Sequence, residues 1–187
     1  MITLAALLLV LDPAANFDLL AAKTLIEKVK SQADGKLPIR DQNEANEVRD
    51  WKAFSQFRYI LLTNIIPSAI LDRKLDCEAM NRLINSAAYD LSGRNLSFCN
   101  LVSNSEVGKL IKNKKDERYS YMTGSVFGML HDSDGVNKFM LQCDIKSTDG
   151  LIATSVAFQF NVLNGKVFEA RQIAAVPMQG SLAKTNG

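Results

Sequence analysis

The chain of 187 residues has few of the residues from which common catalytic centres are built. It contains a single histidine, His131, so a metal site with two His ligands cannot form within one chain, and a Ser-His-Asp arrangement would have to use this residue. Its three cysteines include no pair with the two-residue spacing of zinc and redox motifs. A phosphate loop, a dinucleotide fingerprint, a G-x-S-x-G elbow and a zinc-protease helix are also absent. The sequence therefore predicts no catalytic residue, no metal and no cofactor.

The chain also has little excess of one sign of charge, with 22 Lys and Arg residues against 20 Asp and Glu residues. The formal net charge is only +2, which is too small to indicate nucleic acid or an anionic membrane as the partner. The densest basic stretch, Lys109 to Arg118, is interrupted by Asp116 and Glu117 and contains no aromatic residue for stacking on bases. We therefore expect no nucleic-acid partner.

No apolar run is long enough to cross a bilayer as a helix. Residues 2 to 11 carry no charge, but ten helical residues span only about 15 Å, half of a bilayer core. The run has the length of an export-signal apolar region, although no Lys or Arg precedes it. Two interpretations stay open: an export signal, which predicts a periplasmic or secreted protein, or a structural element of a cytoplasmic one. Either is compatible with a position near a membrane.

The rest of the chain predicts one domain over residues 13–176, between the apolar segment 1–12 and a polar tail at 177–187. Its first part is helical by apolar spacing and capping residues. The expected helices run from Pro13, capped by Asp12, to about Ala33; from the capping box Asp41–Glu44 to Pro67; from near Asp76 to about Gly93; and from the box Ser103–Glu106 to about Lys112.

The second part alternates with a period of two, which is typical of strands. Four strands are expected, at Tyr119–Leu130, Val136–Lys146, Leu151–Leu163 and Lys166–Val176. The Asn164-Gly165 pair between the last two strands is a strong hairpin signal. One face of the second strand is apolar, with Phe139, Leu141, Cys143 and Ile145, and the other is polar. The fold class is therefore α+β, with the N-terminal helices packed on one face of a four-stranded antiparallel meander.

Helices followed by such a meander resemble the NTF2-like or cystatin-like group of folds. The resemblance covers most of residues 40 to 176 and concerns the order of elements. It implies a cavity between helices and sheet. Proteins with such folds serve as enzymes, ligand binders or assembly modules.

The cysteines allow two interpretations. Cys77 is expected at a helix start, where the dipole lowers a thiol pKa, and could pair with His131 as a nucleophile. A structural thiol or a disulfide is favoured over a nucleophile, because Cys77 falls on the apolar stripe of its helix. In an exported chain Cys77 and Cys99 are the natural pair and Cys143 stays alone on the inward strand face, whereas in a reducing cytosol all three thiols stay free. His131 itself begins "HDSDG", which is first of all a turn sequence.

Five residues are candidates to line a binding pocket: Trp51, Phe54, Phe158, Glu169 and Arg171. The aromatic rings could hold an apolar small ligand, and in a regular hairpin Glu169 and Arg171 would point into the cavity. A bulge near Gly165 would instead leave the two charged residues as a surface pair, and this alternative is favoured.

Two functions follow from these patterns. The first is a non-catalytic binding or assembly module of a bacterial-type cell envelope, acting on a protein partner or as a homo-oligomer. The alternative is a ligand carrier or small enzyme of the cytosol with a cavity between helices and sheet.

Overall fold

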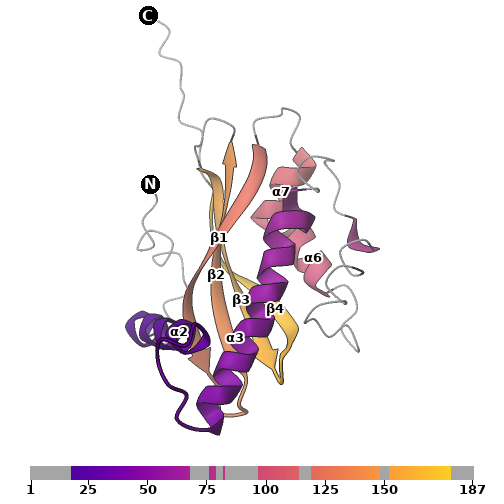
Figure 1. The fold of residues 1–187 in the computed structure, drawn as a ribbon. Helices are drawn as coiled ribbons and strands as arrows, with labels where there is room; N and C mark the ends of the chain where they lie inside the picture. Colours follow the sequence, from indigo (N-terminus) through magenta and orange to yellow (C-terminus); the bar gives the residue numbers. More distant parts are fainter. Residues whose placement is uncertain are drawn as a thin grey trace, which may run out of the picture.

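A computed structural model describes residues 18–67, 76–78, 82, 97–113, 119–147 and 152–177. The helical elements are α2 (Leu19–Ala33), α3 (Gln42–Ile60), the π-helical turn η1 (Leu61–Ile65), α6 (Ser97–Asn104) and α7 (Glu106–Asn113). The strands are β1 (Tyr119–His131), β2 (Asn137–Ser147), β3 (Ile152–Leu163) and β4 (Lys166–Pro177). Helices α3, α6 and α7 share one core with the inner face of the sheet, and α2 packs against β1 (Figure 1). The predicted α+β class is confirmed.

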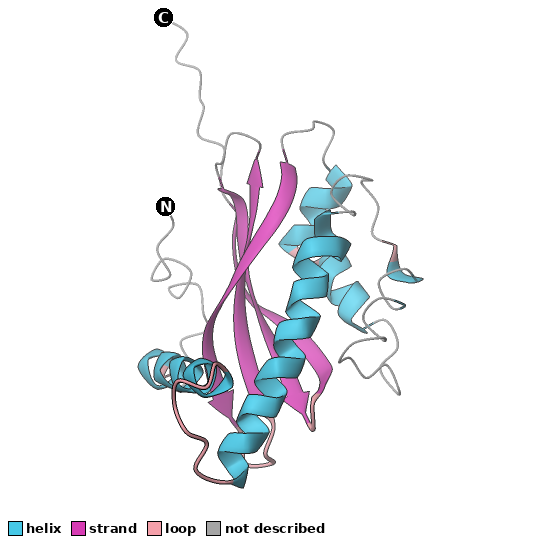
Figure 2. Cartoon of the chain, viewed as in Figure 1, coloured by secondary structure: helices cyan, strands magenta, loops and turns pink. Residues whose placement is uncertain are grey.

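The four strands form one antiparallel sheet in the order β1-β2-β3-β4, and each bound lies within one residue of its prediction. Figure 2 shows the strands as a twisted layer with the long helix α3 running along it. Asn164 and Gly165 have φ angles of 51° and 74°, the left-handed conformation that a two-residue hairpin turn requires at both central positions. The Asn-Gly hairpin is confirmed.

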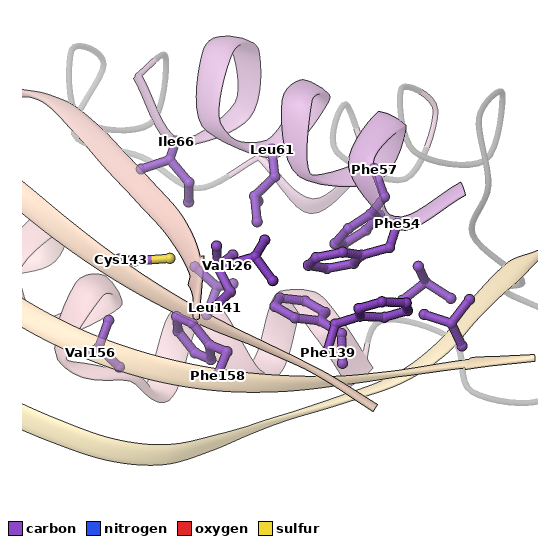
Figure 3. Close-up of a cluster of buried hydrophobic side chains, with 14 of the residues drawn as sticks. Phe54, Phe57, Leu61, Ile66, Val126, Phe139, Leu141, Cys143, Val156 and Phe158 are labelled. Carbon is purple, nitrogen blue, oxygen red and sulfur yellow. The ribbon is translucent and has the colours of Figure 1, made fainter. Parts of the chain in front are cut away.

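Phenylalanine rings fill the space between α3 and the sheet. Phe54 lies parallel to Phe139 with ring centroids 4.9 Å apart, and its centroid lies 5.2 Å from that of Phe160 (Figure 3). The predicted inward residues of β2 are all fully buried: Phe139, Leu141, Cys143 and Ile145. The alternation of β2 therefore places its apolar side against the helices, as expected.

The opposite face of the sheet is not wholly open to water, which corrects the prediction of a polar outer face. Met140 and Ala157 are buried there in a second cluster, together with Phe127 and Ala22 of α2. Gly128 makes this possible, because a Cβ at that position would lie 3.0 Å from the Cβ of Ala22. Helix α2 thus covers part of the outer face, while its Ile26 and Val29 belong to the main core.

The helix boundaries follow capping chemistry, but not always at the predicted residue. The described part of the first helix begins at Leu19, with the Asp18 carboxylate accepting from the Ala21 N–H at 2.9 Å. The predicted start at Pro13 lies outside the described residues. The helix ends at Ala33, as predicted, and Gly35, with φ of 73°, follows it.

Helix α3 begins at the predicted cap, where the Asp41 carboxylate accepts from the Glu44 N–H at 2.9 Å. The Glu44 carboxylate accepts from the Arg40 N–H at 2.8 Å, one residue before the position that a capping box uses. Ahead of Pro67 the helix widens into η1, where the Ile66 N–H donates to the Leu61 carbonyl. This widening suits Pro67, whose ring crowds the carbonyl four residues earlier in a regular helix.

The prediction that Ser103 caps the last short helix is wrong. Ser103 lies inside α6, and Ser105 is the cap of α7, because its Oγ accepts from the Gly108 N–H at 3.3 Å. The two helices meet at a single residue, and the Lys112 ammonium donates to the Ser103 carbonyl across the corner. Of the helix expected from Asp76, the structure describes residues 76–78 and 82, of which Cys77, Glu78 and Arg82 are helical.

Candidate functional site

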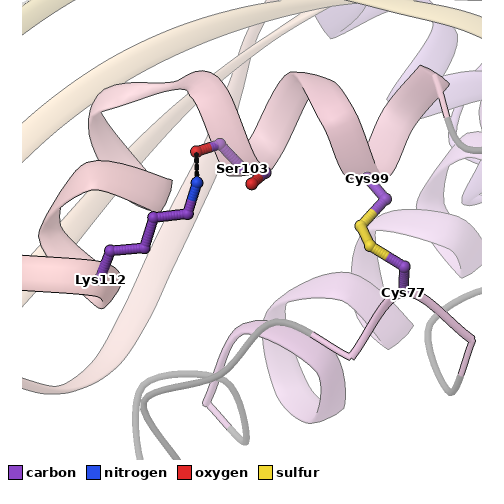
Figure 4. Close-up of a disulfide and its surroundings, with 4 residues drawn as sticks. All are labelled: Cys77, Cys99, Ser103 and Lys112. Carbon is purple, nitrogen blue, oxygen red and sulfur yellow. Dashed lines mark hydrogen bonds between the residues drawn. A yellow bond between two sulfur atoms is a disulfide. The ribbon is translucent and has the colours of Figure 1, made fainter.

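Cys77 and Cys99 form a disulfide that ties residues 76–78 to α6 (Figure 4). The two Cα atoms are 5.8 Å apart and the residues are separated by 22 positions in sequence, which lies in the normal range for this bond. The predicted disulfide is confirmed. In this oxidised form Cys77 has no thiolate, so a nucleophile made of Cys77 and His131 is not present.

Cys143 is the free cysteine of the described residues and is fully buried. Burial, with a smaller effect from Asp144, raises the pKa of its thiol well above the ordinary value. A buried neutral thiol is unreactive, so Cys143 acts as a small apolar core residue.

The five residues predicted to line a pocket do not share one cavity. Phe54 and Phe158 are buried in the main core, and Trp51 is half-buried beside them with its ring centroid 6.2 Å from that of Phe54. Glu169 and Arg171 bond to side chains on the outer face of the sheet. The aromatic rings and the two charges are therefore on opposite faces.

A bulge in β4 causes this separation. Asn161 pairs with Glu169 while Val162 pairs with Val167, so Phe168 is an extra residue between them. Val167 is fully buried on the core side, and the strand reaches Glu169 facing outward. The favoured alternative from the sequence is the one observed, with the bulge at Phe168.

On the outer face a line of polar side chains crosses β3 and β4. The Arg171 guanidinium donates to Gln159 Oε1 at 3.0 Å, and Gln159 Nε2 donates to Asn161 Oδ1 at 2.8 Å. Asn161 Nδ2 in turn donates to Glu169 Oε2 at 2.8 Å. These bonds hold the two charges at fixed places along β4.

His131 lies in a polar cluster that the sequence reading missed. Its Nδ1 is 2.8 Å from Asn137 Oδ1 and its Nε2 is 3.1 Å from Glu47 Oε1. Asn137 Nδ2 donates to the buried Asp50 carboxylate at 2.8 Å, which leaves the amide oxygen facing His131. In the described part of the chain, the partners of His131 are therefore a carboxylate and an amide.

The Asp residues that follow His131 do not orient its ring. The Asp132 carboxylate accepts from the backbone N–H groups of Asp134 and Val136, at 3.0 and 3.2 Å, and pairs with the Lys138 ammonium. These contacts lower the pKa of Asp132, the Lys138 bond most strongly. The "HDSDG" stretch is therefore the turn that its composition predicts.

An open pocket of about 420 Å³ lies between α6 and β4. It is lined by Asn100, Leu101, Asn104, Ser105, Ala170 and Gln172. The Gln172 Oε1 atom is buried and has no hydrogen-bond partner in the described part of the chain. Gln172 also lines the pocket, so its wall includes a polar side chain whose hydrogen-bonding capacity is not fully used within the described residues. Sequence alone could not find this pocket, because its two walls are far apart along the chain.

The two edges of the sheet differ. At β1 the backbone carbonyls of Gly124 and Val126 accept from the Arg58 guanidinium at 2.7 Å and the Lys30 ammonium at 3.4 Å. Cationic side chains along an edge discourage pairing with another chain. Strand β4 pairs with β3 alone among the described strands, and the pocket lies beside it. The pocket and strand β4 together are the candidate functional site.

Comparison with protein-family models, curated proteins and solved structures finds no match to this chain. The resemblance to NTF2-like and cystatin-like folds gains no support from these comparisons. Within the described ranges, no helix has both the length and the apolar character needed to cross a membrane. The same ranges hold no group of three or more His, Cys, Asp or Glu side chains able to bind a metal ion.

Proposed function

We propose that this protein is a non-catalytic binding or assembly module of a bacterial-type cell envelope, periplasmic or secreted, that acts through protein–protein contacts at β4. The observation that carries the proposal is the pocket beside this edge strand, lined by Gln172, whose buried Oε1 has no hydrogen-bond partner among the residues that the structure describes. A strand edge next to a side-chain pocket suits an extended segment of a partner, because main-chain bonds supply affinity and the pocket supplies specificity.

The difference between the two edges supports the same conclusion. Lys30 and Arg58 occupy carbonyls of β1, so that edge is protected against a further strand. Strand β4 carries its charges, Glu169 and Arg171, on the outer face. The side facing α6 presents Ala170 and the Gln172 amide.

The compartment is supported by the Cys77–Cys99 disulfide. Disulfides persist in oxidising compartments such as the periplasm and the extracellular space and are rare in a reducing cytosol. The cytosolic ligand carrier needs a cavity lined by Trp51, Phe54 and Phe158, between α3 and the sheet. In that space Phe54, Phe57, Phe139 and Phe160 are packed with 0% exposure. We therefore do not propose the carrier.

Photo-crosslinking tests the binding edge. In cells that produce the full chain, a photoreactive amino acid replaces Asn104 or Asn100, which are exposed and line the pocket. The matched control carries the photoreactive amino acid in place of the exposed Tyr59 on α3. We expect a discrete crosslinked adduct from both pocket positions and none from the control. No adduct from the pocket positions, or the same adducts from Tyr59, would contradict the proposal.

A further inference from the structure

Strand β4 contains a short stretch that is complementary to itself. Glu169, Ala170 and Arg171 follow one another in the regular run between two bulges, which lie at Phe168 and at Ile173. When an antiparallel strand pairs with its own copy, residues opposite each other must lie on the same face of the sheet. The two-fold axis must therefore lie midway between one residue and the same residue of the second copy, since any other register opposes residues of different faces.

Charge then selects one register. With the axis at Ala170, Glu169 of each copy lies opposite Arg171 of the other, which forms two attractive cross-strand pairs. With the axis at Glu169 or at Arg171, two like charges lie directly opposite each other, which is destabilising. Of the registers centred on these three residues, only the one centred on Ala170 has complementary charges.

The pocket fits the same axis. Ala170 lines the pocket on the face opposite the two charges, so in this register the pockets of two copies lie next to each other across the axis. Gln172, whose Oε1 lacks a partner within the described ranges, comes opposite Phe168 of the second copy. Helix α6 of each copy then lies beside this seam, because α6 packs against β4.

We propose that the partner at β4 is a second copy of this chain, joined by antiparallel β4–β4 pairing centred on Ala170. The assembly is a two-fold dimer with a continuous eight-stranded sheet and the α3, α6 and α7 layers of both copies on one side. This inference rests on the proposed function, since it identifies the partner of the same edge.

A charge-swap series tests the register. The full-length oxidised protein is studied by sedimentation equilibrium over a concentration series, as wild type, Glu169→Arg, Arg171→Glu and the double variant. We expect the wild type to form a dimer. In each single variant both cross-strand pairs become repulsive, so the dissociation constant of the dimer should rise at least about tenfold, and in the double variant it should return towards the wild-type value. Lys52→Glu, a charge reversal on an exposed position of α3, is the control and should leave the dimer unchanged.

Circular dichroism melting shows whether each single variant folds. If a charge-reversal variant does not fold, the alanine variant at the same position, Glu169→Ala or Arg171→Ala, is used in its place. A monomeric wild type at 100 μM overturns the inference, as does a dimer that the single variants do not weaken or the double variant does not restore. The crosslinking experiment separates the two proposals. An adduct of Asn104 with a different protein supports the binding edge and contradicts the dimer, whereas an adduct of twice the chain mass supports both.

Discussion

The Asp50 carboxylate joins helix α3 to two distant turns. It is fully buried, and its Oδ1 accepts from the Gly165 N–H at 2.7 Å in the turn between β3 and β4. Its Oδ2 accepts from Asn137, where β2 begins, and Arg49 neutralises its charge with Nε at 2.9 Å from Oδ1. A buried carboxylate is tolerated only when its lone pairs are satisfied in this way.

Replacing Asp50 with Ala should therefore lower the free energy of unfolding by roughly 2 to 4 kcal/mol, since it removes the acceptor of the Gly165 N–H and of the buried Asn137 amide. Urea unfolding followed by circular dichroism measures the difference. Asp134→Ala, at an exposed position of the turn after His131, is the control and should change the value by less than about 0.5 kcal/mol. Equal effects in the two variants would show that Asp50 does not join these elements.

Glu44 links stability to pH. Its carboxylate accepts from the Arg40 guanidinium and N–H, from the Lys28 ammonium at 2.9 Å and from Gln32 Nε2 at 2.7 Å. These bonds, the Arg40 side chain first, lower the pKa of Glu44 far below its ordinary value of 4.5. Because the unfolded chain takes up this proton at higher pH than the folded one, the stabilisation is complete above pH 4.5 and is lost as the pH falls further.

We expect the urea midpoint of the wild type to fall between pH 5 and pH 3 more steeply than that of Glu44→Gln, which carries no titrating group at this position. Unfolding curves at several pH values across that range provide the comparison. If the two proteins lose stability in parallel, Glu44 does not contribute to the acid sensitivity.

At the scale of elements, close packing between α2 and β1 depends on a glycine. A Cβ at Gly128 would lie 2.8 Å from Met140 Cε and 3.0 Å from Ala22 Cβ. These contacts are shorter than packed side chains allow, so the helix would have to move away from the strand. Gly128 therefore sets how closely α2 covers the outer face of the sheet.

Gly128→Ala should lower the free energy of unfolding by about 1 to 3 kcal/mol through overpacking. Thermal unfolding measures the change, and amide hydrogen exchange should show faster exchange in α2 with little change in β3. Gly135→Ala is a contrasting control: an added Cβ there meets no atom within 4 Å, so its cost comes from a φ of 74° alone. Unchanged exchange in α2 would contradict the packing explanation.

At the scale of the whole molecule, the disulfide and the buried thiol give the chain a defined redox pattern. Cys77 and Cys99 are bonded and Cys143 is enclosed by the core. The chain-entropy model assigns a loop of this length about 3 kcal/mol of stabilisation. Such a bond persists in the oxidising compartment proposed for this protein.

Protein recovered from its native cell should therefore not react with a thiol reagent while it is folded. In denaturant one cysteine should react, and in denaturant after reduction all three should react. Intact mass spectrometry with a thiol-blocking reagent counts these sites. Three reactive thiols in denaturant without reduction would contradict the disulfide and the oxidising compartment together.

Local signals were sufficient for much of the fold. The strand bounds, the Asn164-Gly165 hairpin, the Asp41 cap and the inward face of β2 were predictable, because alternation, turn residues and caps act within a few positions. The Cys77–Cys99 pair was predictable only on the condition that the chain is exported, because nothing local to either cysteine selects its partner. The choice of Ser103 as a cap failed because Ser105, two residues later, satisfies the same chemistry.

The sequence by itself determined the element order, the α+β class and the absence of common catalytic motifs, since these depend on local pattern and composition. Only the tertiary structure decided where the site lies. The Phe168 bulge turned Glu169 outward, the pocket needed α6 and β4 to meet, and Asp50 bonded to Asn137 across 87 residues. Contacts between distant segments depend on how the whole chain packs, and no local pattern of residues encodes them.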